Sequence, residues 1–374
     1  MNNRPPLRLH IPEPDARPGD TPAFDRALIP EPGDTRRPEA STLEAEVRDL
    51  PYGLIRVLDD SGEAKGPWNP NLPTTGEEAI GAAQSLFLDR DDMCFPTYRV
   101  LSWLMARNYP LIDLCNQIFS NEKDPLKGRQ LPILYSARKY GFYSLSGNVG
   151  SRFGHAVGWA MASAFKGGDS IALAYIGEGT TAEGDFHEAL TFASVYKAPV
   201  ILCVTNNQWA ISSFSGIAGA NETTFAAKAL AYGLPGLRVD GNDFLAIWAA
   251  TEWAAERARQ NLGATLIELY TYRASGHSTS DDPTKYRPAD EAEAWPLGDP
   301  VERLKTHLIG LDAWDEDRHA ALIAELDAEV RAAVKEAEAV GTLGKSKPSV
   351  KEMFEGVFKD PDWRVTEQRR ELGI

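Results

Sequence analysis

Short apolar runs alternate with helical segments between residues 154 and 270, and this alternation constrains the fold more than any other feature. The runs are continuously apolar, which predicts strands buried on both faces. Strands separated by helices favour a parallel sheet. We therefore expect an α/β fold with a doubly wound, mainly parallel sheet flanked by helices. The expected strands are 170–176, 200–204, 236–239 and 264–270, and the expected helices are 154–165, 183–196 and 244–259.

The segments on either side of this core differ from it. The first 73 residues carry 13 of the 25 prolines, and each proline removes a backbone donor and disfavours helix just before it. An extended arm with short strands at 7–11 and 53–58 is expected there. A helical body begins near Thr75, the expected N-cap. Further helices are expected at 97–107, at 111–120 and within 299–338. The expected parts are an N-terminal arm 1–73, an α/β domain with C-terminal helices 74–338, and a partner-binding tail 339–374.

Composition excludes several classes of partner. The net charge of −15 argues against nucleic acid and against anionic membrane surfaces. No run approaches the ~20 apolar residues of a membrane span, and the first residues show no apolar signal segment. The three cysteines are too few for a disulfide framework, so we expect free thiols in a reducing compartment. A cytoplasmic protein is expected.

Polar residues follow two of the expected strands. Gly177-Glu178-Gly179 follows the strand 170–176, and Asn206-Asn207 follows the strand 200–204. Ligands of open α/β sheets bind at the carboxyl ends of the strands, so Glu178 and Asn207 should reach one crevice. A carboxylate and an amide oxygen suit Mg²⁺, which shares its ligands with substrate phosphates, and glycines let backbone amides approach a phosphate. The alternative is a plain turn whose polar residues only satisfy the backbone.

The same residues resemble the thiamin diphosphate motif, Gly-Asp-Gly followed by Asn-Asn, with Glu178 in place of Asp. The Glu form resembles the α subunits of branched-chain 2-oxoacid dehydrogenases, also called 2-oxoisovalerate dehydrogenases. The resemblance extends from about residue 7 to the C-terminus. It is carried by 125–132, 177–211, 239–243 and 277–282 with Tyr286-Arg287.

This resemblance implies a thiamin diphosphate-binding fold and a set of roles. The side chains of Glu178 and Asn207 and the backbone carbonyl of Trp209 would bind Mg²⁺. Contacts with the diphosphate would come from Tyr98 and from Arg99, whose guanidinium suits phosphate oxygens. The rest of the cofactor pocket would be lined by Ser146, Gly147, Val149 (an apolar wedge under the bent cofactor), Gly177, Gly179, Glu183 and His277.

His277 is the candidate catalytic residue. It lies in a polar loop after an expected strand, where core packing is disfavoured, and a histidine there can change charge near neutral pH. The resemblance implies that this histidine assists reductive acylation of a lipoyl group. The alternative is a loop histidine without a role.

The resemblance also implies partners. The carboxylate that activates the aminopyrimidine ring cannot be placed in this chain, and in the family it comes from a β subunit. We therefore expect two α and two β chains, docked to a lipoyl-bearing transacylase core. The implied reaction is oxidative decarboxylation of branched-chain 2-oxoacids such as 3-methyl-2-oxobutanoate, active only with the β subunit.

Two departures from the family pattern stand out. The chain runs almost directly from Pro73 to Gly76, where relatives carry one to two more helices, and this is either a true deletion or a segment that the given sequence omits. Arg152 stands where some relatives have a Gln of a potassium site, so no potassium is expected. Two alternatives to the implied function remain. One is the same chemistry on pyruvate or acetoin, and the other is a cofactor-free assembly or regulatory paralogue.

Overall fold

The computed structural model describes residues 6–11, 40–41, 54–55, 74–219, 223–278, 280–341, 349–356 and 359–374. The chain divides into two units. The first unit is Met1–Pro110 with Ile133–Leu326, and the second is Leu111–Pro132 with Asp327–Ile374. Most of the expected arm 1–73 lies outside the described residues.

The first unit is built on a seven-stranded sheet, which confirms the predicted mainly parallel α/β fold. All neighbouring strands run parallel except β1 and β2, which are antiparallel. The strands in spatial order are β1 (Ala40–Ser41), β2 (Leu54–Ile55), β8 (Gly236–Asp240), β9 (Thr265–Tyr270), β5 (Val200–Asn206), β4 (Ala172–Gly177) and β3 (Met93–Phe95).

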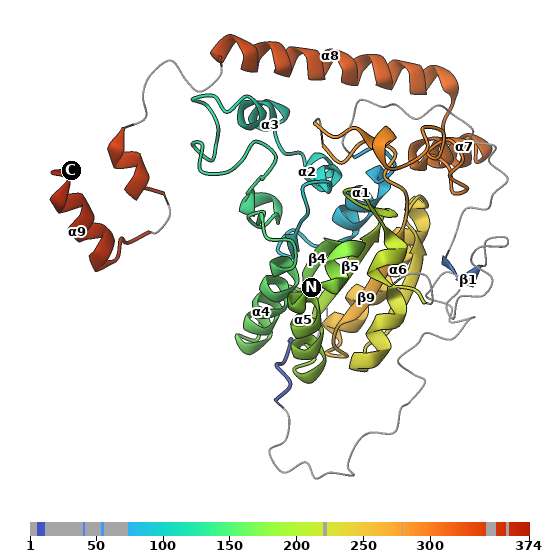
Figure 1. Ribbon diagram of the computed structural model, residues 1–374, viewed down its shortest axis with the longest axis horizontal. Helices are drawn as coiled ribbons and strands as arrows, with labels where there is room; N and C mark the ends of the chain where they lie inside the picture. The colour runs from blue at the N-terminus through green and yellow to red at the C-terminus, as the bar shows by residue number, and fades with distance from the viewer. Residues whose placement is uncertain are drawn as a thin grey trace. The chain divides into compact units, whose positions relative to one another are not determined.

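Helices cover both faces of this sheet. Figure 1 shows α4 and α5 on one side of β4 and β5, and α6 on the other side. Every residue of β5 is buried, as the continuously apolar run predicts. The helices of the first unit are α1 (Glu78–Phe87), α2 (Leu101–Ala106), α4 (Ser151–Phe165), α5 (Gly184–Val195), α6 (Phe244–Arg259), α7 (Pro300–Gly310) and the start of α8 (Glu316–Val340).

The two faces of the sheet have different cores. Alanine-rich packing joins α4 and α5 to one face, with Phe153 and Phe186 as its large buried rings. On the other face a buried amide links three elements, because Gln84 donates from Nε2 to the Thr251 hydroxyl at 3.0 Å and accepts from the Tyr175 hydroxyl at 2.5 Å. A polar residue inside a core requires such partners, so Gln84 fixes α1 against α6 and β4.

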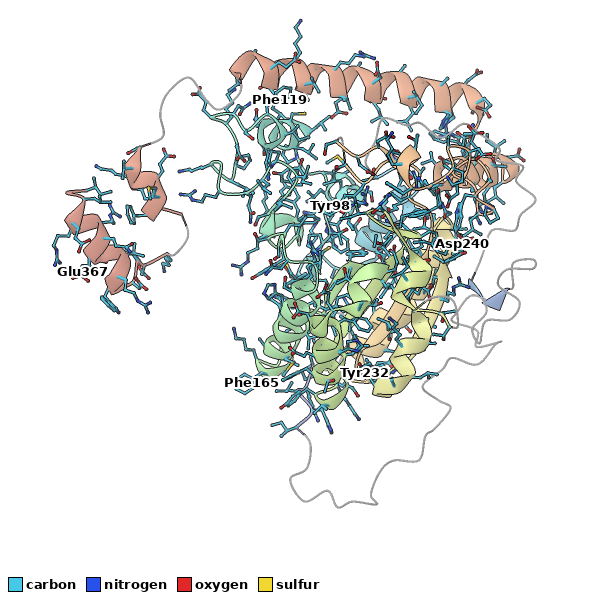
Figure 2. All side chains as sticks on the ribbon, viewed as in Figure 1. Tyr98, Phe119, Phe165, Tyr232, Asp240 and Glu367 are labelled. Carbon is cyan, nitrogen blue, oxygen red and sulfur yellow. The ribbon has the colours of Figure 1, made fainter. Side chains whose placement is uncertain are left out.

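The two ends of the sheet are also distinct. Figure 2 places Tyr98 and Asp240 toward one end of this unit and Phe165 and Tyr232 toward the opposite end. Asp240 ends β8, whereas Tyr232 precedes it, so the end with Tyr98 is the carboxyl end of the strands. Ligand sites of open α/β sheets lie at that end.

Three local expectations need correction. Residues 7–11 do not form a strand; the Leu7 N–H instead donates to the Gly168 carbonyl at 3.0 Å and the His10 N–H to the Tyr196 carbonyl at 3.3 Å. Thr75 does not cap α1, because the helix begins three residues later with Glu77 in the N-cap position. The second helix of the body is shorter than expected, since residues 97–100 form a turn before α2.

The second unit contains α3 (Leu111–Ile118), the remainder of α8, and α9 (Trp363–Glu371). Its small core is formed by Cys115, Ala333 and Ala337. The Asn121 side-chain amide donates to the Ala337 carbonyl at 3.3 Å, which ties the loop after α3 to α8. No described helix of either unit combines the length and apolar character needed to cross a bilayer. All three cysteines of the chain are buried and free.

Candidate functional site

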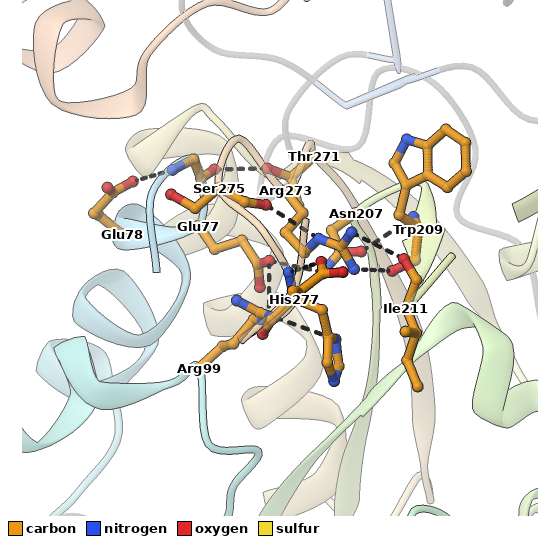
Figure 3. A network of polar contacts seen from close by, with 12 residues as sticks. Glu77, Glu78, Arg99, Asn207, Trp209, Ile211, Thr271, Arg273, Ser275 and His277 are labelled. Atoms are coloured by element: carbon orange, nitrogen blue, oxygen red, sulfur yellow. Dashed lines mark hydrogen bonds and ion pairs between the residues drawn. The ribbon is translucent and has the colours of Figure 1, made fainter. Parts of the chain in front are cut away.

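Loops from four neighbouring strands meet at the carboxyl end of the sheet. Tyr98 and Arg99 follow β3, Glu178 follows β4, Asn207 follows β5, and His277 lies in the loop after β9. Because β9, β5, β4 and β3 are consecutive in the sheet, these residues come from adjacent strand ends. Figure 3 shows the polar network that connects many of them.

Glu178 is a buried carboxylate with an unsatisfied oxygen. It opens a short 3-10 helix after β4 and is only 1% exposed. Its Oε1 has no hydrogen-bond partner among the described residues. Burial, with a smaller contribution from the nearby Glu77, raises the pKa of Glu178 to about 7. Backbone N–H groups of Glu178 and Asn207 stabilise the carboxylate, but Oε1 has no donor in that part of the chain. A buried oxygen without a donor is costly, so Oε1 is suited to a cation.

Asn207 lies at the end of the next strand, and both ends of its side-chain amide are engaged. Its Nδ2 donates to Glu77 Oε1 at 2.7 Å, and its Oδ1 accepts from the Trp209 N–H at 3.3 Å. The preceding Asn206 points elsewhere, because its Nδ2 donates to Glu268 Oε1 at 2.8 Å. The two consecutive asparagines therefore belong to different clusters.

Arg273 connects the loop after β5 to the loop after β9. Its guanidinium is 1% exposed and donates to the carbonyls of Trp209 at 3.0 Å and Ile211 at 2.9 Å. It also donates to the Tyr286 hydroxyl at 2.7 Å, which in turn donates to the Asp281 carboxylate at 2.5 Å. Burial lowers the pKa of Arg273. The Trp209 carbonyl keeps a second lone pair.

Arg99 and His277 form the remaining part of the network. The Arg99 Nη2 donates to the His277 carbonyl at 2.7 Å and lies 3.5 Å from its ring Nδ1. The Tyr98 ring packs edge-on against the imidazole at 5.9 Å and under the Arg99 guanidinium at 5.1 Å. Burial, Arg99 and Arg273 lower the pKa of His277. The imidazole is therefore neutral near pH 7.

The hydrogen bonds of residues 146–149, just before α4, are made with one another and with the first turn of that helix. The Asn148 N–H donates to Ser146 Oγ at 3.1 Å, and Arg152 donates to the carbonyls of Ser146 and Val149 at 2.7 and 2.9 Å. The Val149 side chain is 51% exposed, and a Cβ on Gly147 would meet nothing within 4 Å. Backbone and side-chain surface of this loop are thus open to a ligand.

The turn after β4 brings a second backbone close. A Cβ on Gly179 would lie 2.5 Å from the Ala210 Cβ, so only glycine fits there. A Cβ on Gly177 would meet nothing within 4 Å, and the exposed Glu183 precedes α5 without a side-chain capping bond. Across the residues that the structure describes, no group of three or more His, Cys, Asp or Glu is placed to hold a metal. A cation beside Glu178 would therefore need amide or carbonyl oxygens as further ligands.

Sequence reasoning assigned no role to four residues of this network: Glu77, Arg273, Asp281 and Tyr286. Arg273 follows β9 by three residues, so a charged side chain just past a strand end was the available signal. For Glu77 the only signal was its position beside a glycine at the start of a helix.

Comparisons with known proteins converge on one family. A model described as "Dehydrogenase E1 component" matches residues 61–346, and one described as "2-oxoisovalerate dehydrogenase E1 alpha subunit N terminal" matches residues 5–44. The 2-oxoisovalerate dehydrogenase subunit alpha of Pseudomonas aeruginosa is 52% identical over 410 positions, covering all of both chains.

Two other relatives share less. The mitochondrial 2-oxoisovalerate dehydrogenase subunit alpha 2 of Arabidopsis thaliana is 37% identical and covers 84% of this chain and 66% of its own length. The pyruvate dehydrogenase E1 component subunit alpha of Staphylococcus aureus is 36% identical and covers 84% of this chain and 82% of its own.

The Pseudomonas alignment also bears on chain length. It has 410 positions against 374 residues here, so at least 36 positions of that relative face gaps in this chain. That number of residues is enough for one to two helices of ordinary length.

Proposed function

This chain belongs to the family of dehydrogenase E1 components, and from that premise we propose that it is the α subunit of a branched-chain 2-oxoacid dehydrogenase. Its reaction is the thiamin diphosphate-dependent oxidative decarboxylation of 2-oxoacids such as 3-methyl-2-oxobutanoate, followed by reductive acylation of a lipoyl group. The observation that carries this proposal is the buried, unpartnered Glu178 oxygen at a strand end adjacent to that of Asn207.

Mg²⁺ fits the donor set of this site. Glu178 offers an oxygen without a donor, Asn207 offers Oδ1, and Trp209 offers the second lone pair of its carbonyl. All three are hard oxygen ligands of the kind that Mg²⁺ prefers, and a carboxylate bound in this way shares the ion with substrate phosphates. A divalent cation also offsets the burial that raises the pKa of Glu178.

The thiamin diphosphate would contact several loops at the same end of the sheet. Tyr98 and Arg99 would bind the diphosphate, and the open backbone at Gly177 would let phosphate oxygens approach. Gly179, which is packed against Ala210, would line the pocket through its backbone. The open loop of Ser146, Gly147 and Val149 would receive the aminopyrimidine, and Glu183 and His277 would line the same pocket. When bound, thiamin diphosphate supplies the carbanion chemistry of the reaction.

His277 is held ready to move a proton at Nε2. The Arg99 guanidinium only donates hydrogen bonds, so the Nδ1 that faces it is the lone-pair nitrogen and Nε2 carries the proton. The lowered pKa keeps the ring neutral. The backbone is fixed on both sides, because Arg99 holds the His277 carbonyl and the Asp281 carboxylate accepts the His277 N–H at 2.6 Å.

The active unit requires partners. The carboxylate that activates the aminopyrimidine comes from a β subunit, so two α and two β chains assemble and dock to a lipoyl-bearing transacylase core. The free, buried thiols fit a reducing cytoplasm. The tail 339–374 contributes partner contacts.

Reconstitution tests the proposal. The α chain is purified alone and with its β subunit, and turnover of 3-methyl-2-oxobutanoate and pyruvate is measured with Mg²⁺ and thiamin diphosphate. We expect activity only with β and a preference for the branched-chain substrate. A rate for α alone that added β leaves unchanged would refute the assignment. Preference for pyruvate would favour the activity named for the Staphylococcus relative. Calorimetric titration showing no saturable cofactor binding would favour a cofactor-free paralogue.

A further inference from the structure

Glu77 is an acidic residue at a helix N-cap whose carboxylate does not cap the helix. It occupies the N-cap position of α1 with no side-chain capping bond. Acidic N-cap side chains usually accept from the first backbone N–H groups of their helix. The next residue, Glu78, accepts from the Gly76 N–H through Oε2 at 2.8 Å. The Glu77 carboxylate points into the site, and Figure 3 shows it between Arg99 and Asn207.

Its contacts there are with two residues of the proposed cofactor site. The Oε1 accepts from Asn207 Nδ2 at 2.7 Å and lies 4.0 Å from Arg99 Nε. The side chains of both Glu77 and Arg99 are 5% exposed, so solvent screens this pair little. A buried carboxylate costs free energy unless it is paired and hydrogen-bonded. Its placement between these two residues calls for a role at the site.

The chemistry of a carboxylate fixes which way the Asn207 amide faces. The Asn207 NH₂ group donates to Glu77 Oε1, the same oxygen that faces the Arg99 guanidinium, so the amide turns its NH₂ group toward Glu77. The amide oxygen is then directed away, on the side of the Trp209 N–H at 3.3 Å. Oxygen is the atom that Mg²⁺ binds. The orientation that satisfies Glu77 is thus the one that offers Asn207 as a ligand.

We propose that Glu77 is a positioning residue that locks the Asn207 amide with its oxygen toward the metal and holds Arg99 beside it. This inference rests on the proposed function. Glu77 touches neither metal nor substrate in this scheme; it acts through Asn207 and Arg99. Outer ligand-orienting residues of this kind contribute ~10–100-fold to metal affinity.

The matched pair of variants is Glu77→Gln and Glu78→Gln. A glutamine at position 77 can also donate, so it accepts either orientation of the Asn207 amide and no longer pairs electrostatically with Arg99. Glu78 is next in sequence and also near the start of α1, yet its carboxylate accepts from the Gly76 backbone. Each variant is assembled with the β subunit, and its melting temperature is recorded.

The readout is Mn²⁺ affinity, measured by electron paramagnetic resonance with thiamin diphosphate present, together with calorimetric affinity for the cofactor. We expect Glu77→Gln to weaken Mn²⁺ binding ~10–100-fold and Glu78→Gln to leave it unchanged. Equal affinity in Glu77→Gln and the unsubstituted assembly overturns the inference while leaving the proposed function intact. Absence of binding by the unsubstituted assembly overturns both.

A second variant keeps the test decisive if Glu77→Gln folds poorly. The double substitution Glu77→Gln/Asn207→Asp exchanges donor and acceptor, because the new amide at position 77 donates to the new carboxylate at position 207, which still offers an oxygen to the cation. We expect this double variant to fold and to recover most of the lost Mn²⁺ affinity, whereas Asn207→Asp alone places two carboxylates together and stays weak. Failure of the exchange to recover affinity overturns the inference.

Discussion

Two consecutive asparagines lie at the end of β5, Asn206 as its last residue and Asn207 directly after it, and each is hydrogen-bonded to a carboxylate of a different cluster. Asn206 donates to Glu268, which also accepts from the Ala226 N–H at 2.9 Å and faces Arg238 at 3.4 Å. Both oxygens of Glu268 are thus engaged. Asn207 instead lies beside Glu77, at the strand end next to Glu178, whose Oε1 has no partner among the described residues. Both oxygens of the Glu268 carboxylate have hydrogen-bond donors, whereas one oxygen of the Glu178 carboxylate has none in the described part of the chain and is suited to a cation.

The largest effect is expected in the cluster of Asn206, Glu268 and Arg238. Glu268→Gln leaves Arg238 buried without its carboxylate, and breaking such a pair costs about 3–5 kcal/mol. Chemical denaturation should report this loss. Thiamin diphosphate affinity of the folded fraction should hold, because Glu268 bonds to Asn206 rather than to Asn207. A variant as stable as the unsubstituted chain would mean that the two clusters do not differ in this way.

The reverse outcome is expected at the unsatisfied carboxylate. Glu178→Gln removes a buried carboxylate that has one oxygen without a donor among the described residues, so the melting temperature should hold or rise. Mg²⁺ affinity should fall by at least ~100-fold, the upper end of the effect of losing an outer-shell residue. Calorimetry with thiamin diphosphate measures the affinity. Strong destabilisation with unchanged Mg²⁺ affinity would mean that Glu178, like Glu268, has a structural role and does not bind the metal.

Changes in pH should affect Mg²⁺ affinity and stability through Glu178. The pKa of Glu178 is raised from 4.5 to about 7, so below pH 7 protons compete with the cation and Mg²⁺ affinity should fall about tenfold per pH unit. The stability of the metal-free protein changes with pH in the opposite direction. Because folding raises the pKa of Glu178, its contribution to the free energy of unfolding is fully present below pH 4.5 and is lost as pH rises to about 7. Melting temperatures at pH 5 and 8, with and without Mg²⁺, check both statements; Mg²⁺ affinity that does not vary with pH would contradict the first.

The smallest effect is expected in the His277 loop. Tyr286→Phe keeps the ring against Trp209 but removes the hydroxyl that joins Arg273 to Asp281. Each of its two hydrogen bonds contributes about 1 kcal/mol, so amide hydrogen exchange in the loop that follows His277 should accelerate roughly thirtyfold while the sheet stays unaffected. Uniform acceleration across the sheet would show that this loop is as integral to the fold as the Asn206 cluster.

The buried strands were predictable because their runs are continuously apolar, and β5 and β9 begin within one residue of the expected positions. The strand β3 escaped prediction because three residues carry no periodicity. The N-cap of α1 was expected at Thr75 and is found at Glu77 because residues 74–76 form a turn, so the helix begins later in the chain.

Some residues of the site were likewise predictable from the sequence and others were not. Strand ends predict that Glu178 and Asn207 lie at one edge of the sheet, because adjacent parallel strands end together. The role of Glu77 depends on its contact with Asn207, which is 130 positions away in sequence. The residues around Glu77 do not predict such a contact. Arg273 was overlooked for the same reason, because its partners Trp209 and Ile211 belong to a different loop.

The position of β9 has a consequence for how the protein is made. β9 lies between β5 and β8 although it follows both in sequence. During synthesis β5 therefore keeps an unpaired edge until residues 265–270 emerge, and such an edge invites aggregation. Arg273, which holds the Trp209 carbonyl, emerges just after them. The strand that closes the sheet thus also completes the loop at the site, so a ribosome-bound chain that stops before β9 has neither a finished sheet nor a place for the cofactor.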